Sequence, residues 1–362
     1  MFRSLFRIAS FVVLILILTG IFFAPINAHA KKKFTVAWSI YVGWMPWAYA
    51  ENASILNQWA DKYDIEIELV RMDYISSIEA FVAKQVDGCV MTNMECLDMP
   101  AASGIDSTVL IMGDYSNGND AILTRDGITI KDLPGNDIYL VELSVSHYLL
   151  GRCLAKNGLQ ERQVTIVNTN DSDIGPVFLA NEKQKVVVTW NPIVMNIEQA
   201  PGVSKIFTSA DIPGEILDLM VVETSVLKDH PEFGKALVGA WYEVMRVVSK
   251  RGHPNAPDAF EYMAAESGAT VTEYKNQLRT TAMFYTAQKA VEYAKSKEVQ
   301  TNMNSVRQFC FSHGLLGEGA ESVDEVGILY PDGTVQGDRS NIKMRFDVSY
   351  MEMAANGELT AR

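Results

Sequence analysis

The chain has 362 residues and carries 44 acidic against 31 basic side chains, a formal net charge of −13. A chain this acidic is not expected to bind nucleic acid, because affinity for phosphate backbones comes from dense positive charge. Its length exceeds what one hydrophobic core usually organises, so two lobes are expected.

The first thirty residues have the order of a secretory leader. Arg3 and Arg7 precede an apolar run over residues 11–23, and a small-residue cleavage site ends at Ala30. Since the run is shorter than the roughly 20 residues of a membrane span, we expect residues 1–30 to be a cleaved signal peptide and the mature protein to be periplasmic. An uncleaved N-terminal anchor is the alternative.

Strand patterns and helix patterns alternate along the next part of the chain. Apolar residues at spacings of three and four predict helices over residues 50–63, 76–84, 146–157 and 174–181. Alternation of this kind predicts an α/β fold with mostly parallel sheets. The predicted strands are residues 34–39, 65–70, 88–91, 108–112, 137–141, 164–167 and 186–189.

Two stretches, residues 115–120 and residues 219–222, resemble passages between lobes. If both cross, residues 31–118 begin lobe 1, residues 119–221 form lobe 2, and residues 222–362 return to lobe 1 and continue as a helical C-terminal extension. Two crossings also make a hinge. Helices are expected at residues 233–248, 257–266, 271–278 and 286–315.

Four cysteines, at positions 89, 96, 153 and 310, are too few and too widely spread to form a disulfide framework. Cys89, Cys153 and Cys310 stand in apolar segments, where an unpaired cysteine packs as a small hydrophobe. We therefore expect buried free thiols, with pairing as the alternative.

Residues 141–150 read V-E-L-S-V-S-H-Y-L-L, residues 189–192 read T-W-N-P, and residues 86–88 read V-D-G. On these motifs the chain, from about residue 34 to residue 250, resembles the substrate-binding proteins of nitrate, sulfonate, taurine and thiamine-precursor importers. The resemblance implies a type II periplasmic-binding-protein fold that is hinged. It also implies partnership with an ABC permease and ATPase, no cofactor, no enzymatic activity and a monomer.

Residues 39–47 and 92–96 carry a closer resemblance to a branch named as urea importers and associated with urea carboxylase genes. Kinship with that branch implies guanidinium as the solute, with urea or another small amide as the alternative. Glu142 and Leu143 stand where anion-binding relatives have small residues at a helix N-terminus, so an anionic ligand is doubtful.

Ligands of open α/β sheets bind beyond the carboxyl ends of the strands. This rule selects six short segments that are rich in aromatic and acidic residues, a composition suited to a small planar cation. The segments are residues 41–47, 73–74, 92–95, 114–115, 142–146 and 190–191.

Guanidinium has six N–H donors and no acceptor, so its pocket needs acceptors at the edge and a ring against the face. The edge candidates are Glu95, Glu142 and Asn93, with Asp73 and Asp114 behind them; the face candidates are Trp44 and Trp190, with Tyr41 and Trp47 next.

Each candidate has a structural alternative. Trp47, beside a proline that opens a helix, could simply belong to the core, since tryptophan is usually well buried. Glu95 could interact with a helix dipole and Glu142 could face solvent in a turn. Asp73 and Asp114 could be turn formers.

An enzyme of the thiamine-pyrimidine type on the same fold is the rival class, and a receptor that signals through a membrane sensor is a third. The mature chain has only four dispersed histidines, among them His147, and catalysis by a general base requires a positioned partner. No metal-ligand spacing is present, so neither a metal site nor a catalytic residue is predicted.

Overall fold

The computed structural model describes residues 30–360, so the expected leader lies outside the described residues except for Ala30. Both sheets of the structure belong to one unit that begins at Lys33. Within residues 30–360, no helix has the length and apolar character that crossing a membrane requires.

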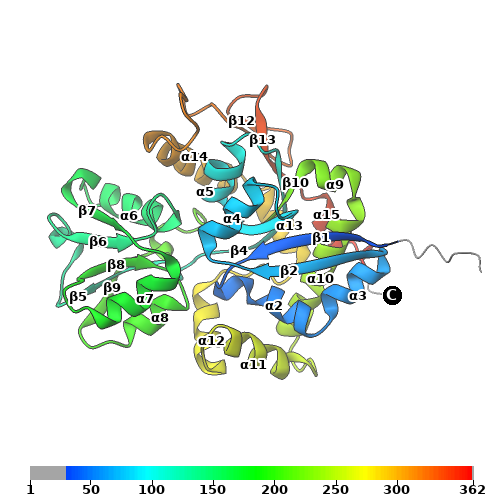
Figure 1. The fold of residues 1–362 in the computed structure, drawn as a ribbon, viewed down its shortest axis with the longest axis horizontal. Helices are drawn as coiled ribbons and strands as arrows, with labels where there is room; N and C mark the ends of the chain where they lie inside the picture. The colour runs from blue at the N-terminus through cyan, green and yellow to red at the C-terminus, as the bar shows by residue number, and fades with distance from the viewer. Residues whose placement is uncertain (1–29, 361–362) are drawn as a thin grey trace, which may run out of the picture. The chain divides into compact units, whose positions relative to one another are not determined.

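The first sheet, called here the large sheet, has eight strands (Figure 1). Strand β2 alternates Ile65, Ile67 and Leu69 on its buried face with glutamates on its exposed face, as an edge strand covered on one side does. In spatial order the strands are β12 (Val335–Gln336), β11 (Gly327–Leu329), β13 (Ile342–Phe346), β4 (Ser107–Tyr115), β10 (Leu217–Glu223), β3 (Gly88–Thr92), β1 (Lys32–Trp38) and β2 (Ile65–Arg71).

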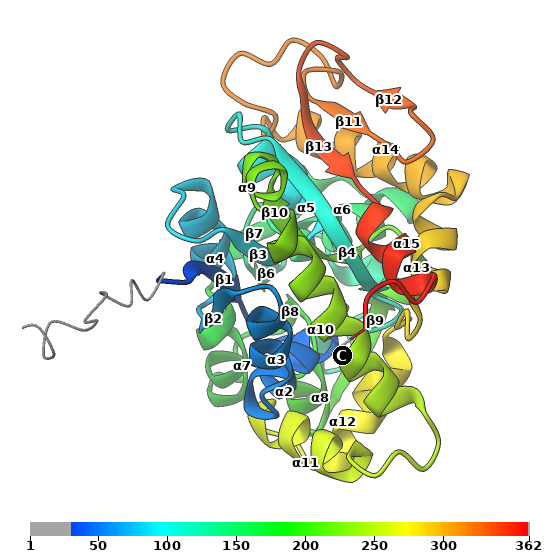
Figure 2. The ribbon, with the colours of Figure 1, turned by 90° about the vertical axis from the view of Figure 1, so that its right-hand side faces the viewer.

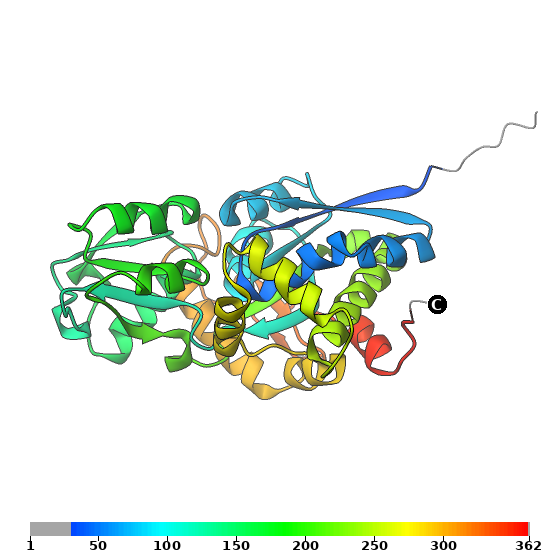
Figure 3. The same ribbon diagram turned by 90° about the horizontal axis from the view of Figure 1, so that it is seen from below.

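The second sheet, called the small sheet, has five strands. Leu123 and Val187 pack with side chains of helices α7 (Asp171–Ala180) and α8 (Ile193–Glu198), whereas Ile122, Val186 and Val188 join the main core with α6 (Val145–Lys156). Successive strand residues point to opposite faces, so helices cover both faces, as Figure 3 shows from below. The spatial order is β7 (Thr165–Asn168), β6 (Asp137–Leu140), β8 (Val186–Thr189), β5 (Ala121–Arg125) and β9 (Val203–Thr208).

The remaining helices pack mainly around the large sheet. The longest of them, α10, buries an apolar face that includes Phe233, Leu237 and Trp241. These helices are α2 (Met45–Asn52), α3 (Ile55–Lys62), α4 (Tyr74–Val82), α5 (Asn93–Cys96), α9 (Thr224–Asp229), α10 (Pro231–Ser249), α11 (Ala256–Glu266), α12 (Val271–Gln277), α13 (Ala287–Ala294), α14 (Lys297–Ser312) and α15 (Ser349–Ala355).

The chain passes between the sheets twice. It leaves β4 after Tyr115 and enters β5 at Ala121, and it returns from β9 to β10 at Leu217. The sequence suggested residues 219–222 as the second passage, but the passage lies before them, between β9 and β10. Those residues are inside β10 because their backbones pair with β3 and β4.

Hydrogen bonds join the two passages to each other. The Ser116 and Ser209 hydroxyls lie 2.6 Å apart, and the Gly118 N–H donates to the Ser209 hydroxyl at 2.7 Å. The backbone N–H of Ser116 donates to the carbonyl of Ile216 at 3.0 Å. The two connections thus meet at one place between the sheets.

The helical C-terminal elements that the sequence predicts are present, but two details differ. The long helix expected at residues 286–315 is broken between Ala294 and Lys297 into α13 and α14. Beyond α14, strands β11 and β13 continue the large sheet beside β4, with β13 parallel to it (Figure 2). Short apolar pieces between turns gave no periodicity long enough to reveal these strands.

The expectation of buried free thiols is confirmed, because Cys89, Cys96, Cys153 and Cys310 are all buried and unpaired. Burial raises the pKa of Cys89 and of Cys153 to about 12. Neither thiol is therefore a ready source of thiolate.

Candidate functional site

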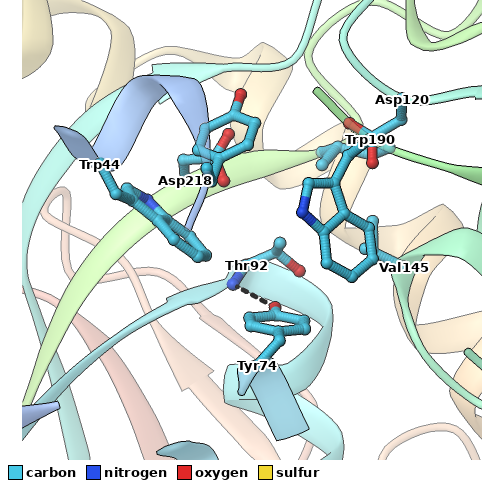
Figure 4. A pocket seen from close by; sticks show the side chains of 9 residues that line it. Trp44, Tyr74, Thr92, Asp120, Val145, Trp190 and Asp218 are labelled. Atoms are coloured by element: carbon cyan, nitrogen blue, oxygen red, sulfur yellow. Dashed lines mark hydrogen bonds between the residues drawn. The ribbon is translucent and has the colours of Figure 1, made fainter. Parts of the chain in front are cut away.

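A small pocket of about 260 Å³ lies where the two sheets meet. The large sheet side supplies residues that follow β1, β2 and β3 and residues at the start of β10, and the small sheet side supplies residues next to β5, β6 and β8. Every lining side chain is at most 5% exposed, so a solute cannot enter unless the structure opens. The lining residues are Tyr41, Trp44, Tyr74, Thr92, Asp120, Val145, Trp190, Ile216 and Asp218 (Figure 4).

Four aromatic rings form a continuous series around the pocket. Ring centroids are 5.0 Å apart for Tyr41 and Trp44, 5.7 Å for Trp44 and Tyr74, and 5.6 Å for Tyr74 and Trp190. Trp44 and Trp190 flank the pocket from opposite sides in Figure 4. The Trp190 indole N–H donates to the Ile40 carbonyl at 3.4 Å, which ties the end of β8 to the loop after β1.

Asp114 and Asp218 form a buried pair of carboxyl groups behind Tyr41. They stand directly opposite each other on the antiparallel strands β4 and β10. The Tyr41 hydroxyl donates to Asp114 Oδ1 at 3.1 Å and accepts from the Asn119 side-chain amide at 3.0 Å. A Cβ on Gly43 would lie 2.4 Å from Asp114 Oδ2, so only glycine allows this close approach.

Asp120 approaches the pocket from the first passage between the sheets. The Ser116 hydroxyl donates to Asp120 Oδ2, and the Asp120 side chain is 3% exposed. Its carboxyl group is thus held at the junction of the two sheets and faces the pocket.

Glu95 lies just behind Thr92 and is fully buried. The Thr92 hydroxyl donates to Glu95 Oε2, and the backbone N–H of Val145 donates to Glu95 Oε1 at 2.7 Å. Val145 is the first residue of α6, so a carboxylate from the large sheet side occupies the N-terminus of a helix on the small sheet side. The helix dipole stabilises negative charge at this position.

These four carboxyl groups have no basic partner. Among residues 30–360, no salt bridge involves Glu95, Asp114, Asp120 or Asp218. Nearby Glu215 differs, because Arg152 binds both of its oxygens at 2.7 and 2.8 Å. The pocket therefore concentrates uncompensated acidic groups.

Burial dominates the protonation of the four acids. It raises the pKa of Asp114 and of Asp120 to about 7, and it raises the pKa of Glu95. The pKa of Asp218 is raised well above its usual range, first by burial and then by the charge of Asp114. Loss of contact with water disfavours the ionised form of each carboxyl group. A bound cation would stabilise the ionised form again.

Five of the sequence candidates lie at this pocket. Trp44, Trp190 and Tyr41 line it, while Glu95 and Asp114 lie directly behind lining residues. The strand-end rule selected these residues because each lies at or just after the end of a strand at the junction of the sheets.

Trp47 and Asn93 are buried but have structural roles instead. Trp47 is 1% exposed and packs against Trp241 with ring centroids 5.1 Å apart, so it belongs to the core. The Asn93 side chain binds the backbone at both ends of the turn into β10, through the Glu215 carbonyl at 3.1 Å and the Leu217 N–H at 2.9 Å. Both polar atoms of the Asn93 amide are therefore already hydrogen bonded to the backbone.

Glu142 and Asp73 lie outside this pocket. Glu142 is exposed, because the turn after β6 directs it to solvent while its N–H donates to Asn168. Asp73 is exposed at the start of α4 and borders an open groove outside Trp190. Neither carboxylate is placed to contact a solute between the sheets.

The sequence did not single out six of the nine lining residues, namely Tyr74, Thr92, Asp120, Val145, Ile216 and Asp218. Tyr74 and Thr92 belong to segments that the strand-end rule selected. Asp120 and Asp218 precede or begin strands, and no rule about carboxyl ends selects them. They could have been found from antiparallel pairing, which sets Ala121 opposite Thr189 and Asp218 opposite Thr92.

A separate cluster contains His147, Glu161 and His313, whose potential ligand atoms lie within 4.8 Å of one another. Glu161 accepts from the Nε2 atoms of both histidines at 2.9 Å. The Leu143 N–H donates to His147 Nδ1 at 3.1 Å, so a neutral His147 carries its proton on Nε2. Hydrogen bonding satisfies the cluster without a metal ion, and the cluster joins α6 to α14.

Residues 116–246 match the family described as NMT1/THI5 like. The chain has the fold of a periplasmic binding protein. No curated protein sequence matches the chain.

Three solved structures illustrate the likeness in fold. The alkanesulfonate-binding protein SsuA from Xanthomonas axonopodis pv. citri, bound to MOPS, is 16% identical with a TM-score of 0.62 and covers 79% of this chain and 94% of its own. A sulfonate-binding SsuA from Methylobacillus flagellatus KT, assigned to a sulfonate ABC transporter, is 14% identical with a TM-score of 0.63, covering 91% and 95%. The nitrate-binding protein NrtA from Synechocystis PCC 6803 is 8% identical with a TM-score of 0.55, covering 90% and 98%.

Proposed function

We propose that this protein is the extracytoplasmic solute-binding component of an ABC importer, and that it captures a small planar nitrogen-rich cation, guanidinium. The names of the similar solved structures support the importer role. The observation that carries the choice of solute is the pocket itself, where two buried carboxyl groups in the wall and two directly behind it, all without a basic partner, stand beside four aromatic rings.

The chemistry of guanidinium fits these groups. Its six N–H donors need acceptors, which Asp120 and Asp218 supply from the pocket wall. Its planar face can lie against Trp44 or Trp190, where the negative face of the ring attracts a cation. The space in the pocket is only about 260 Å³ even with open solvent counted, which favours a small solute.

Anionic solutes such as a sulfonate or nitrate are disfavoured by the same residues. A helix N-terminus that could bind an anion is the start of α6, and there the Val145 N–H already donates to Glu95. No lysine, arginine or histidine lines the pocket. An anion would therefore be buried among uncompensated carboxyl groups, at a cost of several kcal/mol.

Hinge closure is the proposed mechanism of capture. The joined passages around Ser116 and Ser209 are the expected hinge, and the closed form is what the permease would recognise. Because the lining residues are at most 5% exposed, the solute must enter an open form and leave from one.

We therefore expect the radius of gyration in solution scattering to fall when the ligand-free protein is saturated with guanidinium chloride. Taurine, which the pocket should not bind, is the control ligand and should leave the radius unchanged. An unchanged radius at saturating guanidinium would rule out closure on binding.

Urea is the second candidate, and one observation favours it. The indole N–H of Trp44 is buried without a hydrogen-bond partner, and the carbonyl oxygen of urea could accept from it. Guanidinium has no acceptor, so it makes no use of this donor.

Trp44→Phe separates the two solutes because it removes the N–H and keeps a ring. Titration calorimetry should show guanidinium binding weakened by no more than about 1 kcal/mol, the difference between two rings facing a cation. Trp190→Phe is the matched control, since that N–H is already used by Ile40. A parent protein that prefers urea, together with a Trp44→Phe variant that loses about 1–3 kcal/mol of urea binding, would establish urea instead.

The structure offers the rival enzyme class no support at this pocket. Neither a cysteine nor a histidine lines it. His147 is engaged with Leu143 and Glu161 in the separate cluster. We propose no catalytic role for any residue of the pocket.

A further inference from the structure

Asp114 and Asp218 are two buried acids that stand opposite each other, so the pair is expected to hold a proton. The two residues are Cα partners across β4 and β10, where side chains on one face lie roughly 4.5–5.5 Å apart at Cβ. Their side chains are 0% and 3% exposed. Opposed in this way, the two carboxyl groups can hydrogen bond to each other only if one of them carries a hydrogen.

No other group supplies the missing hydrogen. Asp114 Oδ2 and Asp218 Oδ2 are buried and receive no hydrogen bond from any donor among the described residues. The titratable groups that face the pair are the phenols of Tyr41, Tyr274 and Tyr285 and the carboxyl of Asp120. None of these groups is a cation.

Two buried carboxylates in contact do not both ionise while they lack a counter-charge. Burial raises the pKa of both groups, so the pair holds its first proton more tightly than a solvated carboxyl group does. A cation in the pocket changes this balance because Asp218 also forms part of the pocket wall.

We propose that Asp114 and Asp218 share one proton in the empty pocket and that the entering cation displaces it, so that capture of the solute is coupled to release of a proton. The inference rests on the proposed function, since it needs a cationic solute. The O–H bond of the shared carboxyl breaks and its proton goes to water, leaving two carboxylates beside one guanidinium. The net charge of the pair plus its occupant stays at minus one before and after binding.

Exchange of a proton for a cation has a defined sign with pH. Guanidinium stays charged throughout the accessible range. Its affinity should rise by about tenfold per pH unit while a full proton is released, and it should become independent of pH once the pair is ionised in the empty protein. A neutral solute cannot neutralise the negative charge of the second carboxylate, so its affinity should not rise with pH in this way.

Calorimetric titration of the whole ligand-free protein with guanidinium chloride tests the coupling directly. At each pH the titration is repeated in two buffers that both act at that pH and whose ionisation enthalpies differ, so that the difference in heat counts the protons released. We expect at least one proton per guanidinium at pH 6, because Asp120 in the pocket wall also has a raised pKa and can add to the release from the pair, and a value falling toward zero by pH 9. Binding with no proton release at any pH would overturn this inference and leave the proposed function standing, whereas failure of guanidinium to bind would overturn both.

Two isosteric variants locate the proton. Asp218→Asn removes one partner of the pair, so the number of protons released at pH 6 should fall by about one, and binding should be weaker. Asp120→Asn removes the other acid of the pocket wall, so the protons that this variant still releases come from the pair. Proton release that survives Asp218→Asn and disappears in Asp120→Asn would refute the assignment to the pair.

Discussion

Replacing Asp218 with asparagine should weaken guanidinium binding by about 2–5 kcal/mol, because it removes one charge from a desolvated charge pair. The corresponding loss of affinity is about 30-fold to several thousand-fold. Asparagine has nearly the shape of aspartate, and its amide can still donate to Asp114 across the strands. Calorimetry at pH 9, where proton release is expected to be near zero, measures the change in binding of the solute itself.

Glu142→Gln is the matched control for this variant. It removes the same charge from an exposed side chain at the edge of α6, and exposed charges contribute little. We expect guanidinium binding to change by no more than about 0.5 kcal/mol. Equal losses in both variants would mean that the general acidity of the protein, and not the pocket, attracts the cation.

Trp47→Ala should lower the free energy of unfolding by about 3–5 kcal/mol, since Trp47 is 1% exposed and packs on Trp241. Thermal unfolding is the appropriate measurement because both common denaturants, urea and guanidinium, are candidate ligands. The midpoint should fall by several degrees in the ligand-free protein.

Trp44→Ala is the comparison that separates pocket wall from core. Trp44 lines the pocket, so one side of its ring has fewer protein contacts, and its removal should reduce Tm less than Trp47→Ala does. It should instead weaken binding, by about 0.5–2 kcal/mol of lost stacking. A greater loss of Tm in Trp44→Ala than in Trp47→Ala would assign the two tryptophans the other way round.

The sequence predicted those parts of the fold in which local pattern and burial agree. Strand β8 was predicted with its observed bounds, since four residues of Val-Val-Val-Thr are buried on both faces. Strand β10 was mistaken for a passage because its pairing with β3 and β4 is antiparallel and distant in sequence. Strand β12 has only two residues and carries no periodicity at all.

The sequence predicted only those residues of the candidate site that lie at or after the carboxyl ends of strands. The rule about strand ends finds Trp44 and Trp190, which follow strands at the junction of the sheets. It does not find Asp218 or Asp120, because an antiparallel strand places its first residues beside the last residues of its neighbour. Such neighbours become visible only when the register of the sheet is known.

The choice among carboxylates depended on orientation, which the sequence does not contain. Glu95 and Glu142 both stand next to helices after strands, and the sequence ranked them alike. In the structure Glu95 is turned inward by Thr92 and the Val145 N–H, while Glu142 points to solvent. The hydrogen bonds that hold Glu95 come from residues that are close in space and, for Val145, 50 positions away in sequence.

Calorimetric titration of the ligand-free protein with guanidinium, urea, taurine and nitrate, all at one pH above 8, tests the central claim most directly. The pocket of uncompensated carboxyl groups and aromatic rings predicts tight binding of guanidinium, weaker binding of urea and no binding of either anion. Tight binding of taurine or nitrate with no heat from guanidinium would contradict the cationic pocket.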